Sequence, residues 1–125
     1  MPANVFARVA AAYALCSDII SAVDFLPARA PNLVRFRLTF TDGSCLHVSE
    51  DWQSGALGAY SYYWLDPANA LIVGWDNSPH HTEISTFPHH KHVGSQDYRE
   101  PSNETTLENV LAVIRARLAS VSSAP

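Results

Sequence analysis

The sequence predicts an α+β fold, in which a single antiparallel β-sheet of about four to six strands packs against a C-terminal helix and a short N-terminal helix. Three observations point to this fold. Apolar and polar residues alternate through the middle of the chain, turn-forming residues separate the alternating stretches, and apolar residues recur at helical spacing near both ends. The 125 residues, 47% of them hydrophobic, suffice for one core, so we expect a single domain over residues 1–125.

The N-terminal helix is expected over residues 1–16, an alanine-rich stretch. Its apolar residues at helical spacing are Val5, Val9, Ala12 and either Leu15 or Cys16. The stretch lacks the features of a secretion signal, and no run of about 20 apolar residues follows, so we expect no membrane segment. Cys16 and Cys45 match neither a paired zinc spacing nor a disulfide framework, which favours a reduced, cytoplasmic setting.

The sheet is expected within residues 18–93, and its best-defined part is a hairpin. Two neighbouring stretches, LVRFRLTF and CLHVSEDW, alternate between apolar and polar side chains, as in strands with one buried face. A three-residue loop with Gly43 in the left-handed conformation pairs Leu38 with Leu46, which keeps apolar residues together. The opposite face of this hairpin then carries Arg35, Arg37 and His47.

A second hairpin is expected from GAYSYYWL and ALIVGW, which flank the turn-forming residues 66–69. Three aromatic residues of its first strand, Tyr60, Tyr62 and Trp64, share one face because successive side chains of a strand alternate. The pattern leaves open whether this face is buried or exposed.

The C-terminal helix is expected over residues 105–119. Thr105 and Glu108 have the spacing of a capping box, in which both side chains bond free backbone N–H groups at the start of a helix. The apolar residues at helical spacing are Leu107, Val110, Leu111, Ile114 and Leu118. This apolar stripe predicts that the helix covers the sheet.

Residues 75–92, WDNSPHHTEISTFPHHKH, contain five of the six histidines and are the predicted functional segment. Histidine gains and loses a proton near neutral pH, so such a cluster suits acid–base chemistry. A proline precedes each pair of adjacent histidines and favours an extended chain, in which neighbouring side chains point to opposite sides. His90 and His92 should therefore share one side, and His89 and Lys91 the other.

Three interpretations of this segment remain open. In the first, the segment performs acid–base catalysis without a metal ion or any other cofactor, since no recognised metal motif is present. Its candidate catalytic residues are Asp76, His80, His81, His89 and Lys91. In the second, His90 and His92 bind a metal ion with a further ligand from Asp76, Glu83 or His80. In the third, the histidines are structural and bond the irregular loop backbone.

The net charge of −4 gives the molecule no overall attraction to nucleic acid, so any RNA contact must be local. A strand face with basic residues could bind phosphates, and neighbouring aromatic rings could stack on unpaired bases. The candidate substrate-binding residues are Arg35, Arg37, His47 and Arg99 for phosphates, and Tyr60, Tyr62 and Trp64 for bases. The alternative is an ordinary solvated strand face.

The string YSYYWLDPANALIVGWDNSPHHTEISTFPHHKHVG, followed by TLENVLAVI, resembles the TumE family of toxins from bacterial and archaeal toxin–antitoxin pairs, over roughly residues 18–115. The resemblance implies a small toxin, neutralised by an antitoxin that carries a helix-turn-helix domain. By analogy with other small toxins, it implies a metal-independent endoribonuclease with RNA as its target. A metal-dependent hydrolase, a non-enzymatic protein-binding module and a homodimeric state are the alternatives that stay open.

Overall fold

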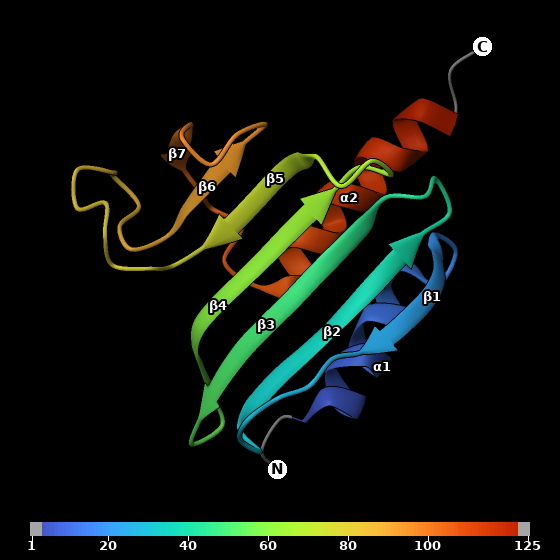
Figure 1. Cartoon of the computed structure of the whole chain (residues 1–125), viewed down its shortest axis with the longest axis horizontal. Helices are drawn as coiled ribbons and strands as arrows, with labels where there is room; N and C mark the ends of the chain where they lie inside the picture. The colour runs from blue at the N-terminus through green and yellow to red at the C-terminus, as the bar shows by residue number, and fades with distance from the viewer. Residues whose placement is uncertain (1–3, 123–125) are drawn as a thin grey trace.

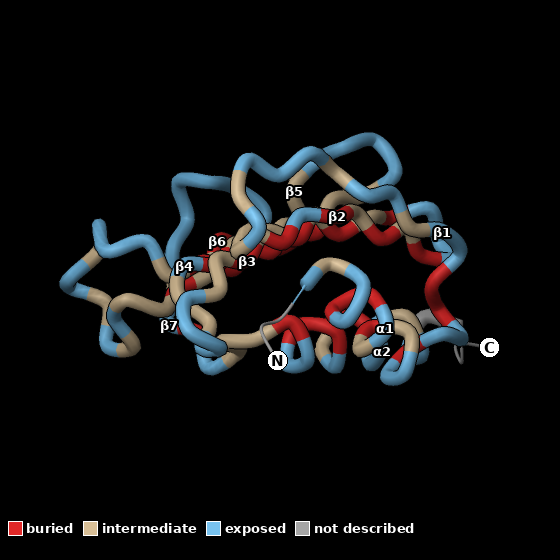
Figure 2. The backbone as a smooth tube through the Cα atoms, turned by 90° about the horizontal axis from the view of Figure 1, so that it is seen from below, coloured by how far each residue is buried: buried red, intermediate tan, exposed pale blue. Residues whose placement is uncertain are grey.

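The computed structural model describes residues 4–122, which form two layers. One layer is a single antiparallel sheet whose strand order follows the chain from β1 to β7, and the other consists of two helices on one face of that sheet (Figures 1 and 2). Helix α1 lies under β1 and β2, while α2 runs under the middle of the sheet (Figure 1). The elements are α1 Val5–Cys16, β1 Ile20–Phe25, β2 Leu33–Phe40, β3 Cys45–Gln53, β4 Ala56–Leu65, β5 Leu71–Asp76, β6 His90–Val93, β7 Arg99–Pro101 and α2 Leu107–Ser122.

The predicted α+β class and the two helices are confirmed, but the sheet of the described residues has seven strands and not four to six. The four strands of the two predicted hairpins correspond to β2 through β5, and β1 precedes them within the range expected for the sheet. The stretch that holds His90 and His92 adds β6, and β7 lies beyond the predicted limit of residue 93. With three residues and a proline, β7 is too short to show any alternation.

The first hairpin has the predicted register. Leu38 lies opposite Leu46, and Gly43 in the intervening loop has a φ of +87°, the left-handed conformation that glycine adopts without strain. In the second hairpin, the structure shows that Tyr62 and Trp64 point toward the helices, where both are buried. The face with Arg35, Arg37 and His47 therefore lies on the opposite side of the sheet, away from both helices.

The helix limits differ from the prediction at both ends. Residues 1–3 of the expected 1–16 helix lie outside the described residues, and α1 starts after Asn4, whose side chain accepts a hydrogen bond from the Ala7 N–H at 2.9 Å. Helix α2 is capped by Thr106 and not by Thr105, because the Thr106 hydroxyl accepts from the Asn109 N–H at 3.1 Å. It continues to Ser122 instead of ending at 119.

A buried ionic network, not predicted from the sequence, joins both helices to the sheet. Arg8 of α1 bonds Glu50 of β3 through Nε and Oε1 at 2.8 Å, and bonds Glu108 of α2 through Nη1 and Oε2 at 3.0 Å. Glu50 occupies an inward position of its strand and accepts a further bond from the Tyr62 hydroxyl at 2.6 Å. Removal of Arg8 would leave a buried carboxylate without its counter-charge, which is strongly destabilising.

None of the helices in residues 4–122 is long and apolar enough to cross a membrane. Cys16 and Cys45 are both free thiols, as expected from their spacing.

Candidate functional site

The face of the sheet opposite the helices, here called the open face, carries the polar residues of the candidate site. Cross-strand pairs place Arg37, His47, Tyr63, Gly74, His92 and Arg99 in one row from β2 to β7. A neighbouring row contains Arg35, Ser49, Ser61, Asp76 and His90. The basic hairpin face and part of the histidine segment therefore share one surface, although they come from distant parts of the chain.

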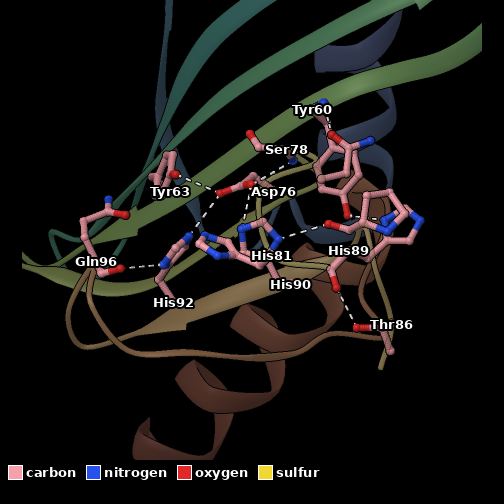
Figure 3. A network of polar contacts seen from close by, with 12 residues as sticks. Tyr60, Tyr63, Asp76, Ser78, His81, Thr86, His89, His90, His92 and Gln96 are labelled. Atoms are coloured by element: carbon pink, nitrogen blue, oxygen red, sulfur yellow. Dashed lines mark hydrogen bonds and ion pairs between the residues drawn. The ribbon is translucent and has the colours of Figure 1, made fainter. Parts of the chain in front are cut away.

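Four residues form the histidine–aspartate cluster: Asp76, His81, His90 and His92. Asp76 ends β5 directly opposite His90, the first residue of β6. His90 Nε2 lies 2.9 Å from Asp76 Oδ1, and His92 Nε2 lies 3.3 Å from Asp76 Oδ2 (Figure 3). All three side chains are more than nine-tenths buried. Two imidazoles of one strand thus converge on one carboxylate of the next.

Backbone carbonyls fix the orientation of both imidazoles. His90 Nδ1 lies 3.0 Å from the Pro88 carbonyl oxygen, and His92 Nδ1 lies 2.9 Å from that of Gln96 (Figure 3). A carbonyl oxygen only accepts hydrogen bonds, so each Nδ1 must carry the proton and donate it. In the neutral form of each ring, the Nε2 atom then carries a lone pair that faces Asp76.

Asp76 is itself held in place by two donors. The Tyr63 hydroxyl donates to Oδ2 at 3.0 Å, and the Ser78 N–H donates to Oδ1 at 3.0 Å. Burial, together with the negative charge of Asp76, raises the pKa of Tyr63 to about 12, so its hydroxyl remains a donor at neutral pH. The Tyr63 ring lies over the neighbouring strand β5 because the residue opposite it, Gly74, has no side chain. A Cβ on Gly74 would lie 2.2 Å from two Tyr63 ring carbons.

His81 completes the cluster from the loop between β5 and β6. Its ring packs edge-on against His90, with centroids 5.0 Å apart, and against His92 at 6.5 Å. The side chain is 22% exposed, and its Nδ1 lies 3.7 Å from a Glu83 carboxylate oxygen. Burial, with smaller contributions from Arg99 and His90, lowers the pKa of His81, which favours the neutral ring at pH 7. His81 is therefore the cluster histidine nearest to solvent.

A hollow of about 300 Å³ adjoins the cluster on the open face. Ser49 and Ser61 line it from the sheet, and Asn77 and Ser78 from the start of the loop after β5. Its wall at Ser78 is the same backbone that bonds Asp76. These four residues give the hollow a polar lining.

Comparison with protein-family models gave one match, described as Toxin TumE, over residues 8–118. The chain belongs to the TumE toxin family. The match confirms the resemblance seen in the sequence and includes the whole cluster. Membership of this toxin family implies an antitoxin partner. No curated protein and no solved structure matches the chain.

In this TumE toxin, the predicted grouping of His80 or His81 with His89 and Lys91 is wrong. His89 and Lys91 do lie on the opposite side of the chain from His90 and His92, as predicted, but that side faces the helices. His89 Nδ1 bonds the Tyr60 hydroxyl at 2.8 Å, and Lys91 Nζ pairs with Glu104 at 3.2 Å. His81 instead joins the open face.

His80 does not enter the cluster either. It is exposed at the start of the loop, and its backbone N–H bonds the Ser78 carbonyl at 2.9 Å. Neither His80 nor Glu83 contacts Asp76, so of the three residues considered as a further metal ligand only Asp76 meets His90 and His92.

Of the predicted basic patch, Arg35, Arg37 and His47 share one face of the β2–β3 hairpin as expected, whereas Arg99 lies away from them. Arg99 lies on β7, at the far edge of the sheet from β2, where it is opposite His92. Arg37 pairs with Asp24 at 2.8 Å, and both side chains are largely exposed. Burial and the two arginines lower the pKa of His47, so it adds no positive charge to the patch at neutral pH.

The predicted stacking surfaces at Tyr60, Tyr62 and Trp64 are also wrong. All three are buried on the helix side, and Tyr62 has no exposed surface. The aromatic residue of this strand on the open face is Tyr63, which was not among the predicted site residues. The register of the first hairpin and the alternation along β4 would have identified it, because Tyr63 lies opposite His47.

Proposed function

We propose that this TumE toxin cleaves RNA at the histidine–aspartate cluster and that a helix-turn-helix antitoxin neutralises it. One observation carries the proposal: a buried carboxylate and three histidines meet on the same open face as Arg35, Arg37 and Arg99. Proton-transfer groups beside cationic side chains are what cleavage of a phosphodiester requires. This cluster takes the place of the predicted catalytic group of His80 or His81 with His89 and Lys91.

His81 and Arg99 are the residues best placed to act on a bound phosphodiester. In the reaction, His81 accepts the proton of the ribose 2′-hydroxyl, and that oxygen attacks the phosphorus. The bond to the 5′-oxygen breaks, and this oxygen takes a proton from water, which leaves a cyclic phosphate and a 5′-hydroxyl end. Arg99, opposite His92, stabilises the negative charge that develops on the phosphate.

The remainder of the open face suits a single strand of RNA. Arg35 and Arg37 of β2 lie four strands from β6, a distance of about 19 Å at the usual strand spacing. A strand that enters over these arginines and crosses Tyr63 reaches the cluster, with the polar hollow beside Asp76 as a place for one ribose or base. Such local contacts allow RNA binding despite the net charge of −4. A target of this kind places the toxin in the cytoplasm.

The test uses three variants expressed in cells and assayed on RNA. His81→Ala and Asp76→Asn are expected to abolish growth arrest and to slow cleavage by about 100-fold or more. His80→Ala is the matched control, since it removes an exposed histidine of the same loop, and it should behave like the wild type. If the folded His81→Ala and Asp76→Asn proteins cleave RNA at the wild-type rate, the site is wrong. Growth arrest and antitoxin binding without any RNA cleavage would favour a non-enzymatic binding module.

A further inference from the structure

We propose that Asp76, His90 and His92 form a binding site for one divalent ion of the first transition series, of the Zn²⁺ or Mn²⁺ type. The inference rests on the proposed function in one respect, that the ion would lie where the phosphodiester is cleaved. It departs from the expectation, drawn from sequence, that the toxin works without a cofactor.

The spacing of the three donor atoms fits such an ion. Metal–ligand bonds of about 2.0–2.1 Å place neighbouring donors of a tetrahedral or octahedral ion about 2.9–3.4 Å apart. The two His Nε2 atoms lie 2.9 and 3.3 Å from the carboxylate oxygens of Asp76, and all three donors lie within 4.8 Å of one another. Each histidine nitrogen thus already lies at metal-donor spacing from one oxygen of Asp76, and a bound ion would draw the three side chains closer together.

The surroundings of the two histidines also match those of metal ligands. A histidine that binds a metal through one ring nitrogen usually donates its other N–H to a carbonyl or carboxylate, which fixes the ring. His90 does so to Pro88 and His92 to Gln96, at 3.0 and 2.9 Å. Two independent backbone carbonyls thus impose the same tautomer on both rings, and both Nε2 lone pairs point to one place.

This arrangement needs a positive charge at its centre. Two Nε2 lone pairs face the oxygens of a buried carboxylate, and lone pairs at this distance repel unless a proton or a cation lies between them. A single divalent ion satisfies all three donors at once, while Tyr63 and Ser78 continue to hold Asp76.

The donor set selects the class of ion. Two imidazole nitrogens and one carboxylate suit zinc, manganese, iron, cobalt and nickel, whereas calcium and magnesium prefer oxygen ligands alone. Three protein ligands leave a coordination position for water or a phosphate oxygen, as in catalytic sites. His81 packs edge-on against His90 and so borders the site.

The experiment measures metal binding directly. Full-length, untagged protein is stripped with a chelator and titrated calorimetrically with Zn²⁺ and with Mn²⁺, and the visible spectrum of the Co²⁺-loaded protein reports on the ligands. One ion per chain is expected to bind. His92→Ala and Asp76→Asn should each weaken binding by more than about tenfold and change the Co²⁺ spectrum. His80→Ala and His89→Ala remove histidines outside the site and should leave affinity and spectrum unchanged.

Two outcomes would overturn the site. One is that none of the three ions binds, and the other is that folded His92→Ala and Asp76→Asn bind as tightly as the wild type. Circular dichroism identifies any variant that fails to fold, and the isosteric Asp76→Asn then carries the test, since it keeps the shape of the side chain.

The experiments distinguish failure of the metal site from failure of the proposed RNA cleavage. If the loaded protein binds one ion through these residues but cleaves no RNA, the metal site stands and the proposed function falls. If RNA is cleaved at the full rate in excess chelator by protein that binds no ion, the proposed function stands and the metal site falls.

Discussion

Gly74 shows how one residue without a side chain makes room for the site. The Tyr63 ring lies across the sheet over Gly74, and its hydroxyl reaches Asp76 at 3.0 Å. Any larger residue at this position would push the ring away from the carboxylate. The position of the Tyr63 hydroxyl at Asp76 therefore depends on the absence of a side chain at Gly74.

Gly74→Ala is expected to destabilise the protein by about 1–3 kcal/mol, because the added Cβ would lie 2.2 Å from two Tyr63 ring carbons. Urea unfolding measures the loss. In a Tyr63→Ala background the clash is gone, so the same substitution should cost little there. An equal loss in both backgrounds would show that the strain arises elsewhere. Tyr63→Phe, which keeps the ring, separates the effect of the lost hydroxyl.

At the scale of single residues, the sequence predicts which histidines share one side of the extended chain, but not which residues of other strands they contact. Adjacent side chains of an extended chain point in opposite directions, which correctly separated His90 and His92 from His89 and Lys91. The rule does not say which of the two sides faces the helices, and it does not place the loop residue His81 relative to either side. The predicted grouping of His81 with His89 is therefore wrong. Only the pairing of β5 with β6, which places Asp76 opposite His90, brings the four residues of the cluster together.

At the scale of elements, the start of α2 offers a sharp test, because two adjacent threonines could cap the helix. Thr106 accepts from the Asn109 N–H, so Thr106→Ala should cost about 1 kcal/mol of stability. Thr105 contributes only its backbone N–H to Asn109, and Thr105→Ala should change stability far less. Thermal unfolding of the two variants compares them directly. The reverse order of losses would restore the capping box predicted from the sequence.

The contact between α1 and α2 predicts how stability depends on pH. Hydrogen bonding to Arg8 holds the pKa of Glu108 below its ordinary value. A carboxylate with a lowered folded-state pKa stabilises the protein above its unfolded pKa, and this contribution disappears as the pH falls through the folded pKa. Urea midpoints should therefore drop between about pH 5 and about pH 3.

Glu108→Gln should make that drop smaller, since the neutral amide does not titrate. The exposed Asp97→Asn is the control and should leave the acid dependence as it is in the wild type. A Glu108→Gln protein with an unchanged acid profile would show that other carboxylates are responsible.

Elements with strong local signals were predictable, and those defined by tertiary contacts were not. The β2–β3 register followed from Gly43 and from apolar alternation, and it is confirmed by the Leu38–Leu46 pair. The strand β7 contains Pro101 and only three residues, so it forms because β6 offers a partner. Likewise, Glu108 suggested a capping box from its spacing, but a stronger interaction with Arg8 engages its carboxylate.

For the whole molecule, both helices lie on one face of the sheet, so a ligand would reach the other face without displacing either helix (Figure 2). If RNA binds there, its affinity should fall as salt increases, because phosphate contacts release counterions. Arg99→Ala should weaken binding and lower the slope of log affinity against log salt by about 1. Fluorescence anisotropy with a single-stranded RNA measures both quantities.

Arg29→Ala is the matched control, since Arg29 is exposed beside α1 on the helix side of the molecule. It should leave the salt slope unchanged. Equal effects of the two substitutions would mean that RNA contacts the protein without preference for the open face.

The order of the strands has a consequence for how the toxin folds during its synthesis. Every strand pairs with the one synthesised just before it, so the sheet can grow strand by strand as the chain leaves the ribosome, and the longest connection to close is residues 77–89 between β5 and β6. Asp76 and both of its histidines are made before α2, the last element of the chain. The protein would thus assemble its candidate site before the helix that seals the core, and a ribosome that stops early would release an uncapped sheet with an exposed apolar face.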